Sequence, residues 1–285
     1  MVDPLFNEIY KAELSTDDFN RLSNFIYRES GIKMPPVKRI MLQSRLQKRL
    51  KELKMTNYKD YCSYVFSQDG LNNEIIHMLD VVSTNKTDFF REPAHFDFLT
   101  SNVLPEFVSS FRSVKNIKIW SAGCSSGEEP YTIAIVLFEF LEKYPGYDFS
   151  ILGTDISTLI LQKAIDAEYT EDRVEGIPLE LKRKYFLRSK DRENPTVKMN
   201  AQMRSKIKFE RLNFMENSYS IYDSFDIVFC RNVLIYFDRE TQERVINKIC
   251  SKISTGGYFF LGHSESIMNM NLPLRQIKPT MFQKI

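Results

Sequence analysis

The pattern of apolar residues in the first part of the chain predicts helices. The apolar positions of the first predicted helix are Phe19, Leu22, Phe25 and Ile26. This helical spacing follows Ser15, whose hydroxyl can cap a helix, and it ends at Gly31, before two prolines. The same kind of spacing predicts three further helices over residues 38–54, 57–66 and 71–82. We therefore expect an all-helical N-terminal domain over residues 1–82.

From about residue 117 short apolar runs alternate with longer stretches of helical periodicity. The predicted strands cover residues 117–122, 149–154, 207–212, 226–230 and 258–261, with a closing edge strand at 275–284. The predicted helices cover residues 129–143, 158–167 and 239–253. This alternation is typical of a parallel sheet with crossover helices. We expect an α/β domain over residues 117–285, preceded by a linker and its first helices at 83–116.

One segment breaks this alternation. Residues 169–206 separate a predicted helix from the next strand by far more than a usual connection. The segment is rich in charge, and residues 196–199 alternate polar and apolar positions. We expect a small inserted subdomain there, part helix and part hairpin.

Composition and charge exclude several classes of protein. The chain has 285 residues, of which 43% are hydrophobic and 27% charged, and this balance excludes wholesale disorder. Its 39 basic and 37 acidic residues give a formal net charge of +2, so no overall field favours nucleic acid as a partner. The longest apolar run, residues 131–138, is too short to cross a bilayer, and residues 1–14 lack the pattern of a signal peptide. We expect a cytoplasmic protein with no direct insertion into a membrane.

The cysteines and histidines predict no metal site. The four cysteines lack a Cys-x-x-Cys spacing, and the three histidines form no cluster of metal ligands. Free thiols in a chain of this size are typical of a reducing compartment. His263 follows a predicted strand, where a lone histidine is more often a hydrogen-bonded loop residue than a catalyst, and we assign it no chemistry.

The clearest local motif is WSAGCSSGEEP at residues 120–130, which follows a predicted strand and opens a helix. Its small residues let a ligand approach the backbone at the carboxyl end of the sheet, where open α/β folds bind ligands. The G-x-G-x-x-G spacing is absent, so phosphate binding is not specifically indicated. An ordinary strand-to-helix turn is an equal alternative. Asp155 ends the next predicted strand. Its carboxylate could accept the ribose hydroxyls of a nucleoside cofactor or cap the next helix, and the pattern leaves both interpretations open.

Five longer blocks occur in a fixed order along the chain. They are STNKTDFFRE (83–92), WSAGCSSGEEPYT (120–132), GTDIS (153–157), FDIVFCRNVLIYFD (225–238) and GHSES (262–266). With these blocks nearly the whole chain resembles the CheR family, the chemotaxis receptor glutamate O-methyltransferases that use S-adenosylmethionine. The resemblance implies a Rossmann-like class I methyltransferase sheet, an all-helical N-terminal domain and a small inserted β-subdomain. It also implies S-adenosylhomocysteine as the product and no metal.

The resemblance implies the residues of the site as well. Those that match the family's cofactor contacts are Asn85, Thr87, Arg91, Glu129, Asp155, Asn213, Phe214, Arg231 and Asn232. Arg91 and Tyr236 match the residues nearest the transferred methyl, so a catalytic role is implied for both. Without the resemblance, a surface ion pair for Arg91 and a core aromatic role for Tyr236 would be favoured. A glutamate acceptor is already ionised at pH 7, so the reaction needs no general base.

A basic helix is the second candidate site. Its basic residues include Lys38, Arg45, Lys48 and Arg49. A solvated face is the usual fate of such charges. The resemblance implies instead that this face docks on the cytoplasmic helical domain of methyl-accepting chemotaxis receptors, which would recruit the enzyme to the membrane.

The sequence disfavours two other functions and one other partner. A nucleic-acid methyltransferase on the same fold is disfavoured by the near-neutral charge and by the lack of an Asn-Pro-Pro-Tyr-type motif after the fourth strand. A non-catalytic cofactor-binding module is disfavoured because Arg91, Asp155 and Tyr236 are all present. Some family members also hold a receptor C-terminal pentapeptide through the inserted subdomain. Here residues 186–198 contain no glycine, and Pro195 lacks an N–H donor, so we expect no such tether.

Overall fold

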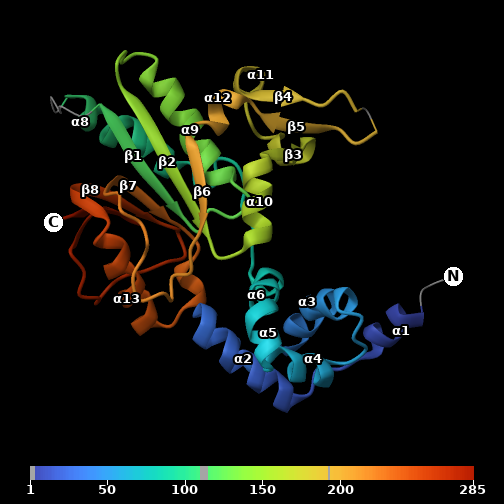
Figure 1. The fold of residues 1–285 in the computed structure, drawn as a ribbon. Coiled ribbons are helices and arrows are strands. Elements are labelled where there is room, and N and C mark those ends of the chain that lie inside the picture. The colour runs from blue at the N-terminus through green and yellow to red at the C-terminus, as the bar shows by residue number, and fades with distance from the viewer. Residues whose placement is uncertain (1–3, 110–114, 192) are drawn as a thin grey trace.

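The computed structural model describes residues 4–109, 115–191 and 193–285, and it has a helical N-terminal part and a mostly parallel sheet (Figure 1). The helices of the N-terminal part are α1 (Pro4–Lys11), α2 (Thr16–Ser30), α3 (Arg39–Glu52), α4 (Tyr58–Val65), α5 (Gln68–Asn73) and α6 (Ile75–Val82). Ser15 caps α2 by accepting a hydrogen bond from Asp18 N, and Gly31 ends it at φ 72°. The helix predicted from the first apolar pattern is thereby confirmed.

The apolar faces of these helices meet in a core of their own. Leu22, Ile26, Leu42, Leu46 and Leu50 are fully buried there. One prediction for this region is wrong, because residues 71–82 are not one continuous helix. The chain forms α5 and α6 with a break at Glu74, which is buried beside Arg49, and Gly70 lies inside α5.

The sheet has seven strands in the order β6-β2-β1-β7-β8-β10-β9. They are β1 (Asn116–Ala122), β2 (Asp148–Asp155), β6 (Ile207–Arg211), β7 (Phe225–Cys230), β8 (Ile253–Leu261), β9 (Leu274–Lys278) and β10 (Met281–Lys284). The first five in the sheet order are parallel, and β10 and β9 add an antiparallel edge. The single edge strand predicted at 275–284 is therefore a hairpin, which turns at Pro279 and Thr280.

Helices cover both faces of the sheet. They are α7 (Ala94–Phe98), a π-helical turn (Leu99–Val103), α8 (Leu104–Ser109), α9 (Glu128–Leu141), α10 (Thr158–Asp166) and α13 (Arg239–Cys250). Alternate residues of β1 point to the two sides, since Ile117 and Ile119 join one core and Trp120 and Ala122 join the other. Strand order reverses beside β1, between β2 and β7, and such a switch point leaves a crevice at the carboxyl ends of the strands.

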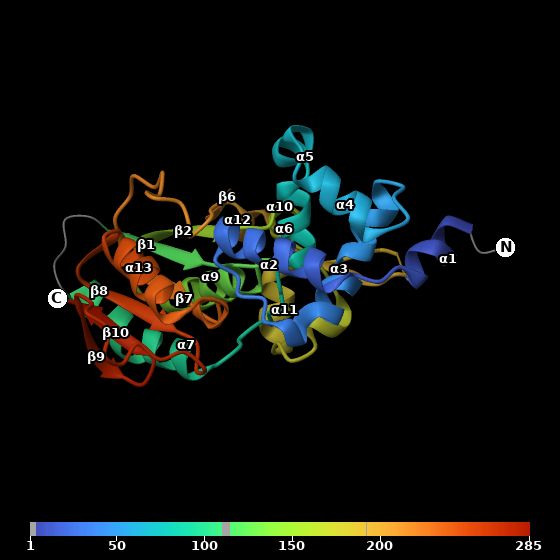
Figure 2. The ribbon, with the colours of Figure 1, turned by 90° about the horizontal axis from the view of Figure 1, so that it is seen from below.

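The predicted insertion is a small antiparallel sheet with short helices. It comprises β3 (Glu168–Thr170), a 3-10 turn (Glu171–Val174), α11 (Leu179–Tyr185), β4 (Phe186–Arg188), β5 (Thr196–Met199) and α12 (Ala201–Arg204), with strand order β3-β5-β4. Figures 1 and 2 show the helical part beyond the carboxyl ends of β1 and β2, with α6 beside α10. Among the described helices, none is both long and apolar enough to cross a membrane.

Candidate functional site

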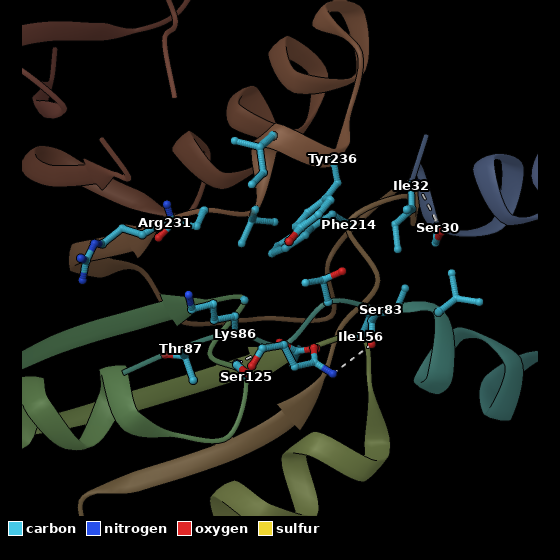
Figure 3. A pocket seen from close by; sticks show the side chains of 18 of the residues that line it. Ser30, Ile32, Ser83, Lys86, Thr87, Ser125, Ile156, Phe214, Arg231 and Tyr236 are labelled. Atoms are coloured by element: carbon cyan, nitrogen blue, oxygen red, sulfur yellow. Dashed lines mark hydrogen bonds between the residues drawn. The ribbon is translucent and has the colours of Figure 1, made fainter. Parts of the chain in front are cut away.

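A pocket opens where the helical part meets the carboxyl ends of the sheet strands. The candidate residues that line it are Asn85, Thr87, Arg91, Glu129, Asp155, Asn213, Phe214, Arg231, Asn232 and Tyr236. Ser30, Ile32, Met34 and Met41 contribute from the helical part. Figure 3 shows Tyr236 and Phe214 pointing into the cavity from one side, with Ser125 and Thr87 on the opposite side. The fold thus brings every candidate residue of the cofactor and catalytic set to one place.

The turn between β1 and α9 forms the floor of the pocket. Gly123 and Gly127 have φ values of 87° and 96°. A Cβ on Gly123 would lie 2.3 Å from Val233 Cγ2, so a side chain is excluded at this position. Gly123 N and Cys124 N both donate to Thr154 O, at 2.7 and 2.8 Å, and this fixes the turn to the end of β2.

Asp155 is buried at the end of β2 and binds the same turn. Its Oδ2 accepts Ser125 N at 2.9 Å, and its Oδ1 accepts Ser157 N at 3.0 Å. Burial raises the pKa of Asp155 against the opposing effect of these backbone N–H groups. The residue that caps α10 is Ser157, whose Oγ accepts Ile160 N, so the helix-cap interpretation of Asp155 is wrong.

Arg231 connects three parts of the pocket wall. Its side chain is 3% exposed, and it pairs with Glu129 at 3.1 Å and with Glu92 at 3.0 Å. It also donates to the carbonyl of Arg91. Burial raises the pKa of Glu129 although Arg231 opposes this. For Glu92 burial also raises the pKa, but Arg231 and His263 together outweigh it, so the pKa is lowered. Arg231 therefore holds the segment that carries Arg91.

That segment has an unusual backbone. Phe90 and Glu92, on either side of Arg91, have φ values of 54° and 56°. Left-handed conformations of such residues cost about 1–3 kcal/mol each, and they persist where the surroundings hold them. Phe90 N donates to Thr132 Oγ1 at 3.1 Å, and Arg231 holds the next carbonyl. The half-buried Arg91 is thus presented to the pocket on a constrained turn, with Nη1 donating to Lys86 O at 3.1 Å.

Asn85 and Thr87 lie in the irregular segment that leads to this turn. Asn85 donates to Ser83 Oγ at 3.1 Å, and its carbonyl accepts Ser125 Oγ at 3.0 Å. The carbonyl of the buried Thr87 accepts Arg173 Nη2 at 2.5 Å. Arg173 belongs to the insertion, so this contact joins the inserted subdomain to the pocket wall; nothing in the sequence pattern indicated it.

Asn213 and Phe214 close the opposite wall. Asn213 Nδ2 donates to Glu29 O at the end of α2, at 2.6 Å, while its Oδ1 accepts Met215 N at 3.0 Å. Phe214 is buried and packs edge-on against Tyr219. The side chain of Asn213 therefore joins the α/β domain to the helical part.

Glu265, in the GHSES block, supports the loop that carries Asn232 and Tyr236. It is buried, and its carboxylate accepts hydrogen bonds from Asn232 N, Leu234 N and Gly262 N at 2.9, 2.7 and 2.6 Å. Asn232 has a φ of 59°. Sequence reasoning marked the block but gave Glu265 no role, since its partners are backbone groups that a sequence does not reveal.

The basic residues of the N-terminal part do not form one exposed face. Lys38 and Arg45 line the pocket, and Arg45 donates to Ser83 O at 3.2 Å and Thr84 Oγ1 at 2.9 Å. Lys48 is exposed. Arg49 has a side chain 9% exposed and pairs bidentately with Glu74 at 2.8 Å, so its assignment to an exposed docking face is wrong. Charge periodicity alone did not distinguish a solvated arginine from one paired inside the core.

The structure also corrects the expectation that the histidines form no ligand cluster. Ligand atoms of Glu92, His95 and His263 lie within 4.8 Å of one another. Burial and the nearby Arg231 lower the pKa of His95 to about 4. Two of these residues are 171 positions apart in the sequence, so their spacing gave no signal.

Comparisons with known proteins match both parts of the chain. Residues 85–282 match the family described as CheR methyltransferase, SAM binding domain, and residues 17–83 match its all-alpha domain. The chain is 38% identical to the chemotaxis protein methyltransferase of Borreliella burgdorferi, with 95% of each chain covered. It is 32% identical to the chemotaxis protein methyltransferase 2 of Pseudomonas aeruginosa, with 93% of this chain and 92% of that one covered. The Escherichia coli chemotaxis protein methyltransferase is also 32% identical, with coverages of 91% and 88%.

Proposed function

The chain belongs to the CheR methyltransferase family, and from this premise we propose that it methylates glutamate side chains of methyl-accepting chemotaxis receptors. It is an S-adenosylmethionine-dependent methyltransferase. The observation that carries the proposal is the single pocket in which residues from four of the five family blocks meet, at the switch point of the sheet.

The residues of the pocket suit the proposed cofactor. Asp155 presents a buried carboxylate with free lone pairs, which can accept ribose hydroxyls. Phe214 and Ile156 offer apolar walls that suit an adenine ring, and the glycine turn permits close approach to the backbone. Glu129 and Arg91 offer charges complementary to the amino and carboxylate groups of a methionyl moiety. S-adenosylmethionine supplies, when bound, an electrophilic methyl group on a sulfonium.

The protein's own contribution to the reaction is positioning. The acceptor carboxylate is ionised at neutral pH, so the site has no proton to remove and the transfer is proposed to need neither a general base nor a metal ion. Arg91 and Tyr236 are proposed to align the acceptor carboxylate and to exclude water from it. Orientation of this kind can supply about 7–11 kcal/mol. We expect kcat to show no dependence on a group that titrates near pH 7.

The proposed docking surface consists of Lys38, Arg45 and Lys48 beside the pocket mouth. Val37 and Ile40 lie next to it and are 86% and 63% exposed, which gives the surface an apolar component as well. Through this surface we propose that the enzyme is recruited from the cytoplasm to the receptor's helical domain. Nucleic acid is not proposed as a partner, because a formal net charge of +2 gives no overall field that favours it.

We propose that the inserted subdomain does not tether a receptor C-terminal pentapeptide. Two backbone donors of its β4–β5 connection are already used, since Glu193 N and Asn194 N both donate to Asp191 Oδ1, at 2.9 and 3.3 Å. Addition of a peptide strand requires free backbone groups. Calorimetric titration with an aromatic-ended pentapeptide tests this, and a micromolar dissociation constant would overturn it.

Product chemistry tests the proposed function directly. The protein is incubated with S-adenosylmethionine carrying a labelled methyl group and with receptor-containing membranes, and the products are then treated with mild alkali. A glutamate methyl ester releases labelled methanol, whereas an N-methyl product keeps its label. Label that stays on the receptor after alkali would contradict the proposed acceptor.

A further inference from the structure

A cluster of two histidines and one glutamate lies beside Arg231. Glu92 Oε2 is 3.5 Å from His95 Nδ1 and 4.0 Å from His263 Nε2. None of the three residues belongs to the described lining of the pocket. The cluster is therefore not explained by the proposed methyl transfer, and the inference drawn from it goes beyond that function.

His95 has an unsatisfied ring nitrogen that faces this cluster. Its side chain is fully buried, and Nε2 lies 2.9 Å from Thr280 Oγ1. Because the hydroxyl of Thr280 can donate its own proton to Pro279 O at 2.7 Å, this contact is satisfied in the tautomer whose Nε2–H donates to Thr280 Oγ1. A neutral imidazole has only one N–H, which leaves a lone pair on Nδ1. Among the described residues, Nδ1 has no hydrogen-bond partner.

This lone pair and the carboxylate oxygen of Glu92 face one another in a buried place with no proton between them. Such an arrangement is unfavourable by itself, because buried polar atoms normally have a partner. A cation bound by both atoms removes the conflict. The hydrogen bond from His95 to Thr280 is also the kind of outer contact that fixes the tautomer of a metal-binding histidine.

We propose that Glu92, His95 and His263 bind a zinc ion, with the fourth coordination position open to solvent. Two imidazoles and one carboxylate are a ligand set that zinc takes, at bond lengths of about 2.0–2.2 Å. Tetrahedral bonds of that length place neighbouring ligand atoms about 3.4 Å apart, close to the 3.5 Å between Glu92 and His95. His263 is 56% exposed in its side chain, so its ring can turn to complete the site.

Arg231 limits the affinity of this site. Its guanidinium is 3.0 Å from the same Glu92 oxygen, so zinc has to share that carboxylate with a positive group. Arg231 also pairs with Glu129, and these two carboxylates and one guanidinium carry one negative charge in excess. The bound cation offsets this charge. We expect micromolar affinity, weaker than that of closed structural zinc sites.

Cobalt and zinc titrations of the full, untagged chain test the proposal. Cobalt(II) is expected to give the visible absorption of a four-coordinate site with nitrogen and oxygen ligands, and zinc is expected to abolish it. His263→Ala should lower the affinity for both metals by at least about tenfold, since loss of even an outer partner of a metal site lowers metal affinity about 10–100-fold. The matched control is His77→Ala, which removes the third, exposed histidine, on α6, and should bind both metals as the wild type does.

A second measurement locates the metal without relying on the variants. In proton–nitrogen spectra of the histidine rings, zinc should shift the signals of His95 and His263 and leave those of His77 in place. The four cysteines are all buried, so no thiolate-to-cobalt band is expected. Wild-type affinity in His263→Ala, a thiolate band, or no response of either histidine to zinc would each overturn the proposal.

Discussion

Asp155 holds two parts of the pocket together, and its charge is proposed to contact the cofactor. Asp155→Asn keeps the shape but turns one acceptor oxygen into a donor that faces a backbone N–H. We expect affinity for S-adenosylhomocysteine to fall by roughly 1–3 kcal/mol, the range for a hydrogen bond to a charged group. This corresponds to about 5–150-fold in the dissociation constant, measured by calorimetry.

The control for this substitution lies on the same strand. Asp148 is at the amino end of β2, where it pairs with Lys206 on the surface at 2.5 Å. Asp148→Asn should leave affinity for the cofactor product unchanged, because it is at the end of the strand remote from the pocket. Equal affinities of wild type and Asp155→Asn would reject the assignment of Asp155 to the ribose.

Tyr236 is expected to act on turnover more than on binding. Its ring points into the cavity, and its backbone carbonyl accepts Lys33 N at 3.0 Å, so the backbone position survives a change of side chain (Figure 3). For Tyr236→Phe we expect kcat to fall at least about tenfold, equivalent to ~1.4 kcal/mol of transition-state stabilisation. The dissociation constant for the cofactor product should change little.

Tyr222→Phe is the matched control, since Tyr222 is fully exposed and outside the pocket lining. Methyl transfer to receptor membranes and calorimetry would be measured on both variants. If Tyr236→Phe kept the wild-type kcat, its hydroxyl would have no part in the transfer, and only the ring would remain as a candidate.

At the scale of elements, the loop after β7 depends on Glu265. Its carboxylate accepts hydrogen bonds from three backbone N–H groups, of which those of Leu234 and Gly262 are buried. Glu265→Gln should lower the free energy of unfolding by about 1–3 kcal/mol, the cost of leaving buried groups unsatisfied. It should also lower kcat, because the same loop presents Tyr236. Urea unfolding measures the effect on stability, and a methyl-transfer assay measures the effect on kcat. Glu240→Gln, at an exposed position, is the control. If Glu265→Gln kept the wild-type unfolding midpoint and the wild-type kcat, the loop would not depend on this carboxylate.

A second contact between elements is sensitive to acid. Tyr27 on α2 donates to Asp238, which caps α13 by accepting Thr241 N at 2.9 Å. The Tyr27 hydroxyl and then this backbone N–H lower the pKa of Asp238 below its ordinary value. A lowered carboxyl pKa means that the stabilisation is present above the unfolded-state value of about 3.9 and is lost as pH falls through the folded-state value.

Tyr27→Phe should therefore be less stable than the wild type at pH 6, and the difference should shrink as the pH falls below about 4. Urea unfolding at a series of pH values measures this difference. Tyr222→Phe is a suitable control, because Tyr222 is fully exposed. A difference that stayed constant down to pH 3 would mean that the Asp238 charge does not contribute to this contact.

Elements with local signals were predictable, and elements set by distant contacts were not. The cap at Ser15 and the alternation along β1 are local, so α2 and the central strand followed from the sequence. The break between α5 and α6 depends on Glu74, whose partner Arg49 lies 25 residues earlier. In the site, the family blocks located the lining residues, but not the pairing of Arg231 with Glu92, 139 residues away. Such pairings arise from the fold, and apolar periodicity carries no information on them.

At the scale of the whole molecule, the pocket belongs to both parts of the chain. Ile32 and Met34 line it from the helical side. Two hydrogen bonds join the parts there: Lys33 N donates to Tyr236 O, and Asn213 Nδ2 donates to Glu29 O. The proposed docking surface therefore adjoins the catalytic opening. A receptor helix held there would lie within reach of the pocket without a separate tether.

Charge reversal tests this arrangement, and the structure determines which residues to change. Arg49→Glu would place a second acid against Glu74 inside the core, and Arg45 holds the 82–84 backbone, so neither isolates docking. The informative variant is Lys38→Glu with Lys48→Glu. We expect slower methylation of receptor membranes. Calorimetry with S-adenosylhomocysteine separates lost docking from any effect of Lys38 on the pocket that it lines.

The control reverses two exposed lysines outside the proposed surface, Lys54→Glu with Lys59→Glu, and keeps the same net charge as the test variant. Attraction between surface charges is screened over about 8 Å at physiological ionic strength. The wild-type rate should therefore fall as salt rises, and the Lys38 and Lys48 variant should lose most of that salt dependence, while the control keeps it. Equal rates and equal salt dependence in the two double variants would show that Lys38 and Lys48 are only solvated charges, and that the receptor reaches the pocket by another face.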